Sequence, residues 1–363
     1  MRLSRRDMMV SAAAAGVMAS APALAQATGD ADARLMALFD RFADDILNHS
    51  PETATGLGLD KGDRRRLKHR LSDRSLGALA YDRSACLSHV RAMKQFDRAS
   101  LSSANQIRYD AVEYAFQLGA DGGKFGYGIN TFGAAMGESA GPYIVSQQGG
   151  ALVGIPEFLN SQHKIANADD CEAYLDRLAQ FPRQLDQETA CIRHDAARDV
   201  TPPDFILDTT LTQARAMRGQ IAANTQMVQS LATRAAALHI DGAWSSRAAH
   251  IVETQVYPAI NRQIAALQSL RAGASHDAGV WKLPDGEAYY DWLLKVGTST
   301  PMTPDEVHQL GLTQGAQIDA EMDGILKAHG LRNGAVGERM SQLTRDPRFL
   351  KPNTDAGRRE VMQ

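Results

Sequence analysis

The sequence predicts a mainly α-helical fold: a multi-helix array with one glycine-rich irregular region. Apolar residues recur at helical spacing along most of the chain, and helix start and stop signals flank several of these runs. The exception is residues 119–154, which hold eleven of the thirty glycines and few periodic apolar positions. That region is either a long surface loop or a segment that acts as a lid or forms part of a substrate groove.

The first 25 residues predict a cleavable export leader. A basic end with Arg5 and Arg6 precedes an Ala-rich apolar run, and Ala23 and Ala25 form a small-x-small cleavage site. The arginine pair resembles that of a twin-arginine leader, whose export machinery transports folded cargo. An uncleaved anchor is the alternative, but the run is poor in Leu and Ile. We therefore expect a periplasmic or secreted protein with no stable membrane anchor after cleavage.

The charge of the chain argues against nucleic acid as a partner. Cleavage removes three of 39 basic and one of 42 acidic residues, so the net charge changes from −3 to −5. The basic cluster at residues 64–70 is typical of a solvated helix face. The three cysteines fit no disulfide framework, and we expect buried thiols at Cys86, Cys171 and Cys191.

Three helices are predicted around the glycine-rich region. The first covers residues 30–48 and ends at Ser50–Pro51. A capping box from Ser103 to Gln106 begins the second, and one face of that helix carries Ile107, Ala111, Tyr114, Ala115 and Leu118. Asn167 caps the third, which Pro182 should kink and whose apolar positions are Cys171, Leu175, Leu178, Leu185 and Ile192.

Four further helices are predicted towards the C-terminus. One covers residues 211–238, and another covers 245–271 with a kink near Pro258. Thr303 and Glu306 form a capping box for a helix that stops at Gly330. Thr354–Asp355 begins a final helix whose apolar face is incomplete at Gln363, so we expect a chain truncated at its C-terminus.

No complete catalytic or metal-binding motif occurs in the sequence. There is no His-Glu-x-x-His and no Gly-x-Ser-x-Gly, and the pair His250 and Glu253 lacks the further ligands that zinc needs. Residues 56–62 loosely match a dinucleotide fingerprint with the wrong spacing, and a turn between helices is predicted there. The sequence therefore identifies no catalytic residue, metal ligand or cofactor site.

Several longer strings, in this order behind the leader, resemble a large bacterial family known only as a domain of unknown function. That family is similar to the helical zincin-like metallopeptidases. The strings are Ser50-Pro-Glu-Thr-Ala-Thr-Gly-Leu-Gly58, Pro142-Tyr-Ile-Val-Ser-Gln147, Pro156-Glu-Phe-Leu159, Leu185-Asp-Gln-Glu188, Thr201-Pro-Pro-Asp-Phe-Ile206, Gly279-Val-Trp-Lys-Leu-Pro-Asp-Gly-Glu-Ala-Tyr-Tyr290, Thr303-Pro-Asp-Glu-Val-His-Gln-Leu-Gly311 and Asp346-Pro-Arg-Phe349. The resemblance covers nearly all of residues 26–363. It implies a two-half helical fold around a substrate channel, of which this chain is the front part.

The departure from the family concerns its chemistry. Family members carry a His-Glu-x-x-x-His-type zinc helix in a later half, and this chain ends before it. The resemblance implies zinc-dependent peptide-bond hydrolysis for a full-length member, but no zinc and no reaction for this chain alone. Two alternatives stay open: a non-catalytic helical periplasmic binding or scaffold protein, and a non-metal hydrolase without a visible nucleophile.

Five residues are candidates for contacting a peptide substrate along the channel wall. Tyr143, Ser146 and Gln147 lie at the end of the glycine-rich region, and Tyr289 and Tyr290 lie early in a short helix that Asp285 caps. Paired aromatic residues are also typical of a packed core, so each candidate has a structural alternative.

Overall fold

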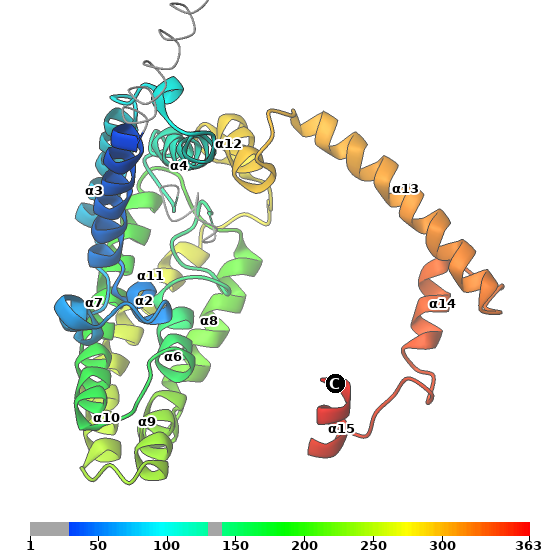
Figure 1. Ribbon diagram of the computed structural model, residues 1–363. Coiled ribbons are helices and arrows are strands. Elements are labelled where there is room, and N and C mark those ends of the chain that lie inside the picture. Colours follow the sequence, from blue (N-terminus) through cyan, green and yellow to red (C-terminus); the bar gives the residue numbers. More distant parts are fainter. Residues whose placement is uncertain (1–28, 130–139) are drawn as a thin grey trace, which may run out of the picture. The chain divides into compact units, whose positions relative to one another are not determined.

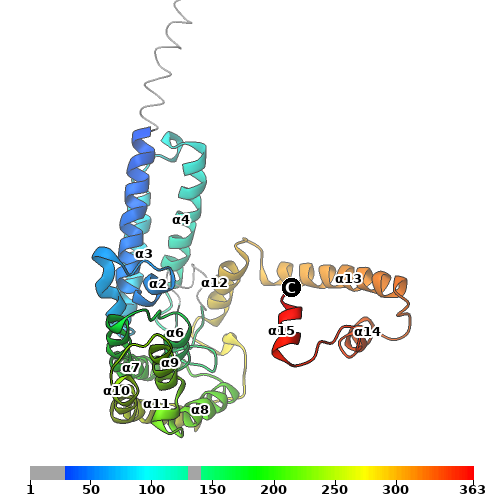
Figure 2. The same ribbon diagram turned by 60° about the horizontal axis from the view of Figure 1, so that its bottom comes forward.

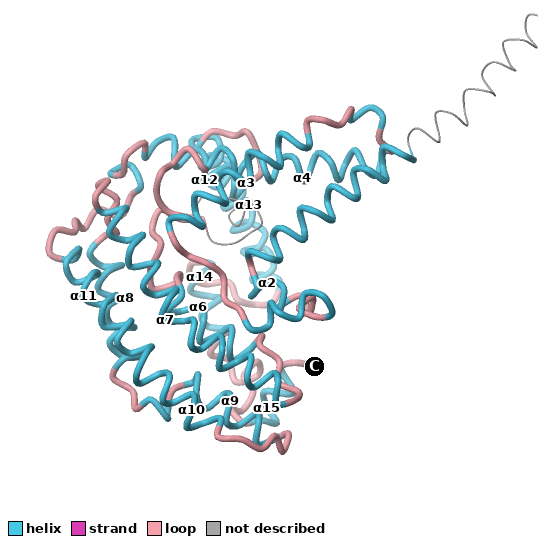
Figure 3. Tube along the Cα trace, turned by 90° about the vertical axis from the view of Figure 1, so that its left-hand side faces the viewer, coloured by secondary structure: helices cyan, strands magenta, loops and turns pink. Residues whose placement is uncertain are grey.

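The computed structural model describes residues 29–129 and 140–363, so the leader residues Arg5, Arg6, Ala23 and Ala25 lie outside the described residues. Within these ranges the chain is helical, with no strand beyond one isolated bridge between Ile129 and Gly141 (Figure 3). The predicted mainly α-helical fold is confirmed. The chain divides into two compact units, Met1–Thr298 (unit 1) and Ser299–Gln363 (unit 2).

Unit 1 begins with three long helices that share a core (Figure 2). They are the helix over residues 29–49, α3 (Leu76–Met93) and α4 (Ser103–Gly122). Their shared core contains Leu35, Leu38, Phe42, Cys86, Val90, Met93, Phe116 and Ala120. The first helix matches the predicted range 30–48 and ends at Ser50.

Helix α4 differs from its prediction in its cap and in its buried face. The N-cap is Ser102, whose hydroxyl accepts a hydrogen bond from the Asn105 amide. Ile107 is 70% exposed, and Ala111 and Tyr114 are exposed as well. The helix instead packs through Tyr109, Val112, Phe116 and Ala120, which are three or four residues apart. Since α4 carries two apolar stripes, only its neighbours decide which one is buried.

A short segment after the first helix crosses onto the longest helix of unit 1. It comprises α2 (Pro51–Gly56), a turn with positive φ angles at Gly58 and Gly62, and the 3₁₀ helix η1 (Gly62–His69). The predicted turn at residues 56–62 is confirmed. The basic cluster is only partly a solvated face, because Lys68 Nζ lies 2.5 Å from an Asp170 carboxylate oxygen and so pairs with that acid.

The rest of unit 1 is built around α7 (Ala168–Ala196), which packs against α6 (Ala151–Ser161), α9 (Gln226–Ala237), α10 (Trp244–Ile251) and α11 (Tyr257–Arg271) (Figure 1). Asn167 caps α7 by accepting a hydrogen bond from the Asp170 amide, and the predicted apolar positions are buried. The helix runs on through Pro182. All three cysteines are buried and free, as predicted.

Two predicted helices are divided in the structure. Residues 211–238 are not one helix, because α8 (Asp204–Arg218) ends at Gly219 and η3 (Ala222–Asn224) precedes α9. Residues 245–271 contain α10 and α11 joined by a π-helical turn, η4 (Val252–Val256). The wider turn lies just before Pro258, where the missing proline N–H removes an α-helical hydrogen bond.

The irregular segment is shorter than residues 119–154, since α4 continues to Gly122 and α6 begins at Ala151. Its described part includes buried side chains at Phe125, Tyr127, Ile144 and Val145. It is therefore more than a surface loop. Residues 130–139 of it lie outside the described residues.

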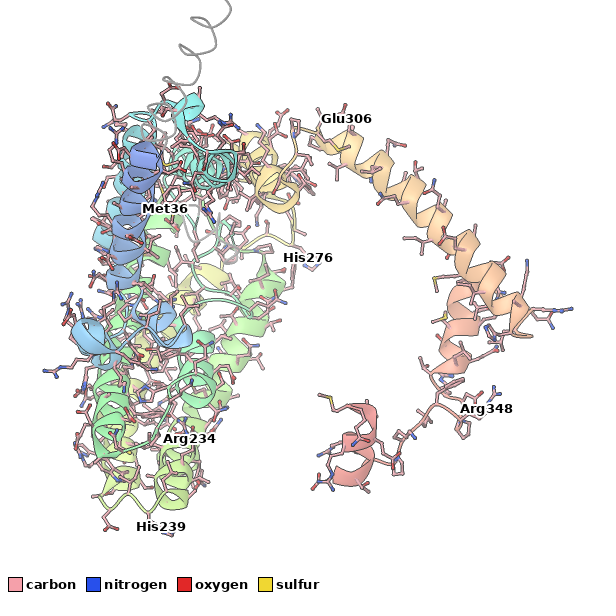
Figure 4. The ribbon with its side chains drawn as sticks, in the orientation of Figure 1. Met36, Arg234, His239, His276, Glu306 and Arg348 are labelled. Carbon is pink, nitrogen blue, oxygen red and sulfur yellow. The ribbon has the colours of Figure 1, made fainter. Side chains whose placement is uncertain are left out.

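Unit 1 ends with η5 (Val280–Lys282) and α12 (Gly286–Thr298), and unit 2 contains α13 (Pro304–Ala328), α14 (Val336–Leu343) and α15 (Asp355–Val361). The predicted capping box is confirmed: the Thr303 hydroxyl accepts from the Glu306 amide, and the Glu306 carboxylate, at the start of α13 in Figure 4, accepts from the Thr303 amide. Across residues 29–129 and 140–363, no helix has both the length and the apolar character needed to cross a bilayer.

Candidate functional site

A groove in unit 1 runs between the helix over residues 29–49 and α3. Two adjoining hollows form it, of about 360 Å³ and about 250 Å³. They share the side chains of His49, Ser50, Thr53, Leu79, Tyr81, Asp82 and Ile129. The volume of the larger hollow lies within the range of small-ligand pockets.

The larger hollow is mainly apolar. Its lining includes Ile46, Leu47, Leu57, Leu59, Ala85, Cys86 and Phe116. Leu57 is 65% exposed, so part of this apolar surface faces solvent at the groove mouth. A hollow of this kind accommodates an aliphatic or aromatic side chain, because water leaves apolar surface on binding.

The Asp45 carboxylate connects the two walls of the groove. The Tyr81 hydroxyl on α3 donates a 2.6 Å hydrogen bond to Asp45 Oδ1. His49 Nδ1 lies 3.4 Å from Oδ1, and His89 Nε2 lies 3.6 Å from Oδ2. The His49 ring stacks on Tyr81 with centroids 4.2 Å apart. One carboxylate is thus surrounded by a phenol and two imidazoles.

Two pKa shifts define the charges in this cluster. Burial and the hydrogen bond to Asp45 raise the pKa of Tyr81 to about 12, so the phenol keeps its proton and remains a donor. Burial lowers the pKa of His89, whose ring packs between Phe42 and Phe116. His89 is therefore neutral at pH 7 and leaves the negative charge of Asp45 in place.

The smaller hollow is lined mostly by polar side chains, among them an ion pair between a buried carboxylate and a partly exposed arginine. Glu188 on α7 is 1% exposed, and Arg74 Nη1 donates to it at 2.7 Å. Glu188 also accepts from the Ala151 amide at the N-terminus of α6. Burial raises the pKa of Glu188. Beside this pair, the Glu52 carboxylate accepts from the amide and hydroxyl of Ser72.

The described residues do not fit the zinc that the family resemblance implies. Among them, no three His, Cys, Asp or Glu side chains form a group that could hold a metal ion. His250 ends α10, and Glu253 lies in the following π-helical turn. The groove therefore offers charged, hydrogen-bonding and apolar side chains, and the described residues supply no ligand set for a metal ion.

The structure brings two predicted site residues together outside the groove. Tyr143 and Tyr289 join an aromatic cluster with Phe125, Tyr127 and Trp292. Tyr289 is fully buried and stacks on Tyr127 with centroids 5.3 Å apart. Burial raises the pKa of Tyr143 to about 12 and also raises that of Tyr289, and neither hydroxyl has a hydrogen-bond partner among the described residues.

The other three predicted site residues are separate from this cluster. The Ser146 hydroxyl accepts from the Gln148 amide within a turn. The Gln147 carbonyl accepts from the Gln213 side chain, and Tyr290 is 48% exposed on α12. None of the three lines the groove.

Sequence reasoning missed the groove residues Asp45, Tyr81, His89, Arg74 and Glu188. Asp45 and His49 are four residues apart, which places them on one helix face. That spacing is common on exposed helices, and nothing in it indicates α3 as the opposite wall. Only the helix spacing was available as a signal, and it does not distinguish a site from an ordinary surface.

Comparison with known proteins gives one family and one fold. A family model described as "Bacterial protein of unknown function (DUF885)" matches residues 51–363. The crystal structure of the "putative lipoprotein from Colwellia psychrerythraea" is similar, with a TM-score of 0.83 and 24% identity over 91% of this chain. At that identity the similarity concerns the fold alone. The match covers 57% of that protein's chain, so this chain spans little more than half its length. No curated protein matches this chain.

Proposed function

We propose that this chain, which belongs to the DUF885 family of bacterial proteins, binds peptides as the front part of an exported zincin-like protein. The groove of unit 1 is the observation that carries the proposal. Its apolar hollow suits a large side chain, and its polar hollow offers hydrogen-bonding groups to a peptide backbone. Peptide-bond hydrolysis is proposed only for a longer family member that carries a zinc helix.

We propose further contacts from the residues predicted at the channel wall. Ile144 lines the polar hollow, so its neighbours Tyr143, Ser146 and Gln147 lie along the same segment. We propose that a longer peptide, extending past this hollow, contacts that segment. Tyr289 is buried, and its proposed role is to support Tyr143; Tyr290 is accessible on α12.

A binding assay with the purified chain tests the peptide proposal. A fluorescein-labelled peptide rich in Leu should show saturable anisotropy, and mass spectrometry should find it uncleaved with added zinc. Leu57→Asp, at the mouth of the apolar hollow, should weaken binding. Leu238→Asp is the matched control, because Leu238 is 50% exposed and lies outside the groove.

The outcomes of this assay separate the two parts of the proposal. Absence of saturable binding, or equal losses in both variants, would contradict the groove as a peptide site. Chelator-sensitive cleavage by this chain would contradict the assignment of hydrolysis to longer members only.

The export proposal rests on residues 1–25, and the similar structure belongs to a protein described as a lipoprotein. We expect twin-arginine export to a periplasmic or secreted location. Replacing both Arg5 and Arg6 by Lys should retain a reporter fusion in the cytoplasm, as measured by cell fractionation. A fusion that reaches the periplasm at the unchanged rate would refute a twin-arginine leader.

A second candidate is a non-catalytic binding or scaffold protein, and the apolar face of α13 favours it. Leu310, Ile318 and Ile325 are between 43% and 61% exposed there. On this alternative the chain self-associates or binds another protein, and it does not bind short peptides. Sedimentation of the purified chain distinguishes the candidates, because a monomer that binds peptides contradicts the scaffold.

A further inference from the structure

We propose that the groove recognises the free amino terminus of a peptide whose first side chain is large and apolar. This inference rests on the proposed peptide-binding function and names its ligand class. Asp45 holds the ammonium group, the apolar hollow takes the first side chain, and the rest of the peptide runs towards the polar hollow.

The position of Asp45 favours it as the ammonium site. Its carboxylate lies in the larger hollow, where Tyr81 from the opposite wall orients it through a 2.6 Å hydrogen bond. The nearest nitrogens of the His49 and His89 rings lie 3.4 and 3.6 Å away, and 29% of the Asp45 side chain is exposed. Because a carboxylate has about four acceptor positions, this exposed part leaves capacity for the donors of an ammonium group. The Tyr81 phenol keeps its proton, so it donates to Asp45 and adds no charge that would compete with the ammonium group.

The charges of the lining select a cation over an anion. Five carboxylates line the two hollows: Asp45, Glu52, Asp73, Asp82 and Glu188. Arg74 is the one lysine or arginine among the lining residues, and it is paired with Glu188. His89 is neutral because its ring is buried among aromatic side chains. The amino end of a peptide is therefore attracted to this groove, and its carboxylate end is repelled.

The apolar lining selects the first side chain. Ile46, Ala85, Cys86 and Phe116 line the same hollow as Asp45, within about 360 Å³. The α-ammonium and the first side chain leave the same carbon atom of a peptide, so both reach this hollow together. A leucine or phenylalanine in the first position gains from burial there, and glycine does not.

Three peptides test the inference: Leu-Gly-Gly-Gly-Lys with fluorescein on the lysine side chain, its N-acetylated form, and the version with Gly in the first position. Acetylation removes the positive charge and keeps the leucine. We expect it to weaken binding about tenfold, the effect of losing one partly screened ion pair. The glycine peptide should also bind less tightly than the leucine peptide.

Asp45→Asn should remove the preference for the free amino terminus while keeping a similar shape beside Tyr81. Asp44→Asn is the matched control, because Asp44 is the neighbouring carboxylate, pairs with Arg64 and does not line the groove. Asp44→Asn should prefer the free peptide over the acetylated peptide by the same factor as the unmodified chain. Circular dichroism verifies that both variants fold.

The outcomes distinguish a failure of this inference from a failure of the proposed peptide-binding function on which it rests. If none of the peptides binds, the proposed peptide-binding function fails. If free and acetylated peptides bind equally, or Asp45→Asn keeps the preference, peptide binding stands and the amino-terminal inference is overturned. If Asp45→Asn does not fold, the salt dependence of the unmodified chain decides: high ionic strength must weaken the free peptide more than the acetylated one.

Discussion

Units 1 and 2 carry equally clear helix signals but differ in how much side-chain surface they bury. In α7 of unit 1, Tyr174, Leu178, Phe181 and Leu185 are fully buried. Among the hydrophobic residues of unit 2, Leu326 is the one that is buried. The difference shows that capping and periodicity determine where a helix forms, whereas burial of its apolar face depends on distant packing partners.

The deepest burial in unit 1 includes a charged group. Arg177 on α7 is fully buried, and its guanidinium donates to His163 Nδ1 at 2.8 Å, to the Thr55 hydroxyl at 2.6 Å and to the carbonyls of Leu67 and Arg70. Burial lowers the pKa of Arg177 to about 10, which still leaves it protonated at pH 7. These bonds attach residues 55–70 to α7.

The largest expected effect comes from breaking this network. Arg177→Met should cost about 3–5 kcal/mol in the free energy of unfolding, because several buried acceptors lose their donor. Arg262→Met, in an exposed pair with Asp186, is the control and should cost less than about 1 kcal/mol. Urea denaturation followed by circular dichroism measures both, and similar costs would contradict the importance of buried Arg177.

A matched pair of truncations tests the contrast between the units directly. Leu185→Ala in α7 should cost about 3 kcal/mol, because it leaves a cavity in a fully packed core. Ile318→Ala in α13 should cost less than about 0.5 kcal/mol, since Ile318 is 56% exposed. Thermal denaturation compares them, and a large cost at Ile318 would indicate that the face of α13 is covered in solution.

One buried histidine should make unit 1 less stable in acid. Burial, with Arg177 nearby, lowers the pKa of His163 to about 4, below the 6.5 of an exposed histidine. The stabilisation is therefore complete above pH 6.5 and is lost as the pH falls towards 4, by up to about 3 kcal/mol. His163→Gln should flatten this dependence in denaturation curves from pH 7 to 4.

The smallest effect concerns a purely local signal in unit 2. Thr303→Ala removes the capping box of α13 and should cost about 1 kcal/mol, mainly by fraying the first turn. Hydrogen exchange of the amides at residues 304–307 should accelerate. Thr313→Ala, a mid-helix exposed threonine of the same helix, should leave that first turn unchanged. Equal acceleration in both variants would refute the role of the cap.

The sequence predicted the positions of most helices. The predictions were wrong where the residues were compatible with more than one buried face or more than one helix end. Helix α4 has two apolar stripes, and contact with its neighbours buries Phe116 and leaves Ile107 exposed. Residues 211–238 were predicted as one helix, yet α8 ends at Arg218 with Gly219 as its C-cap, and the Tyr257 hydroxyl from α11 donates to the Gln220 carbonyl in the turn that follows. Such choices depend on residues far along the chain.

By itself the sequence determined the helical class of this protein, the caps at Asn167 and Thr303, and the family to which the chain belongs. These features depend on hydrogen bonds and apolar repeats within a few residues. The tertiary structure alone decided the groove, because Asp45 meets Tyr81 across 36 positions and Arg74 meets Glu188 across 114. A contact between helices depends on their packing, and no local pattern of residues encodes it.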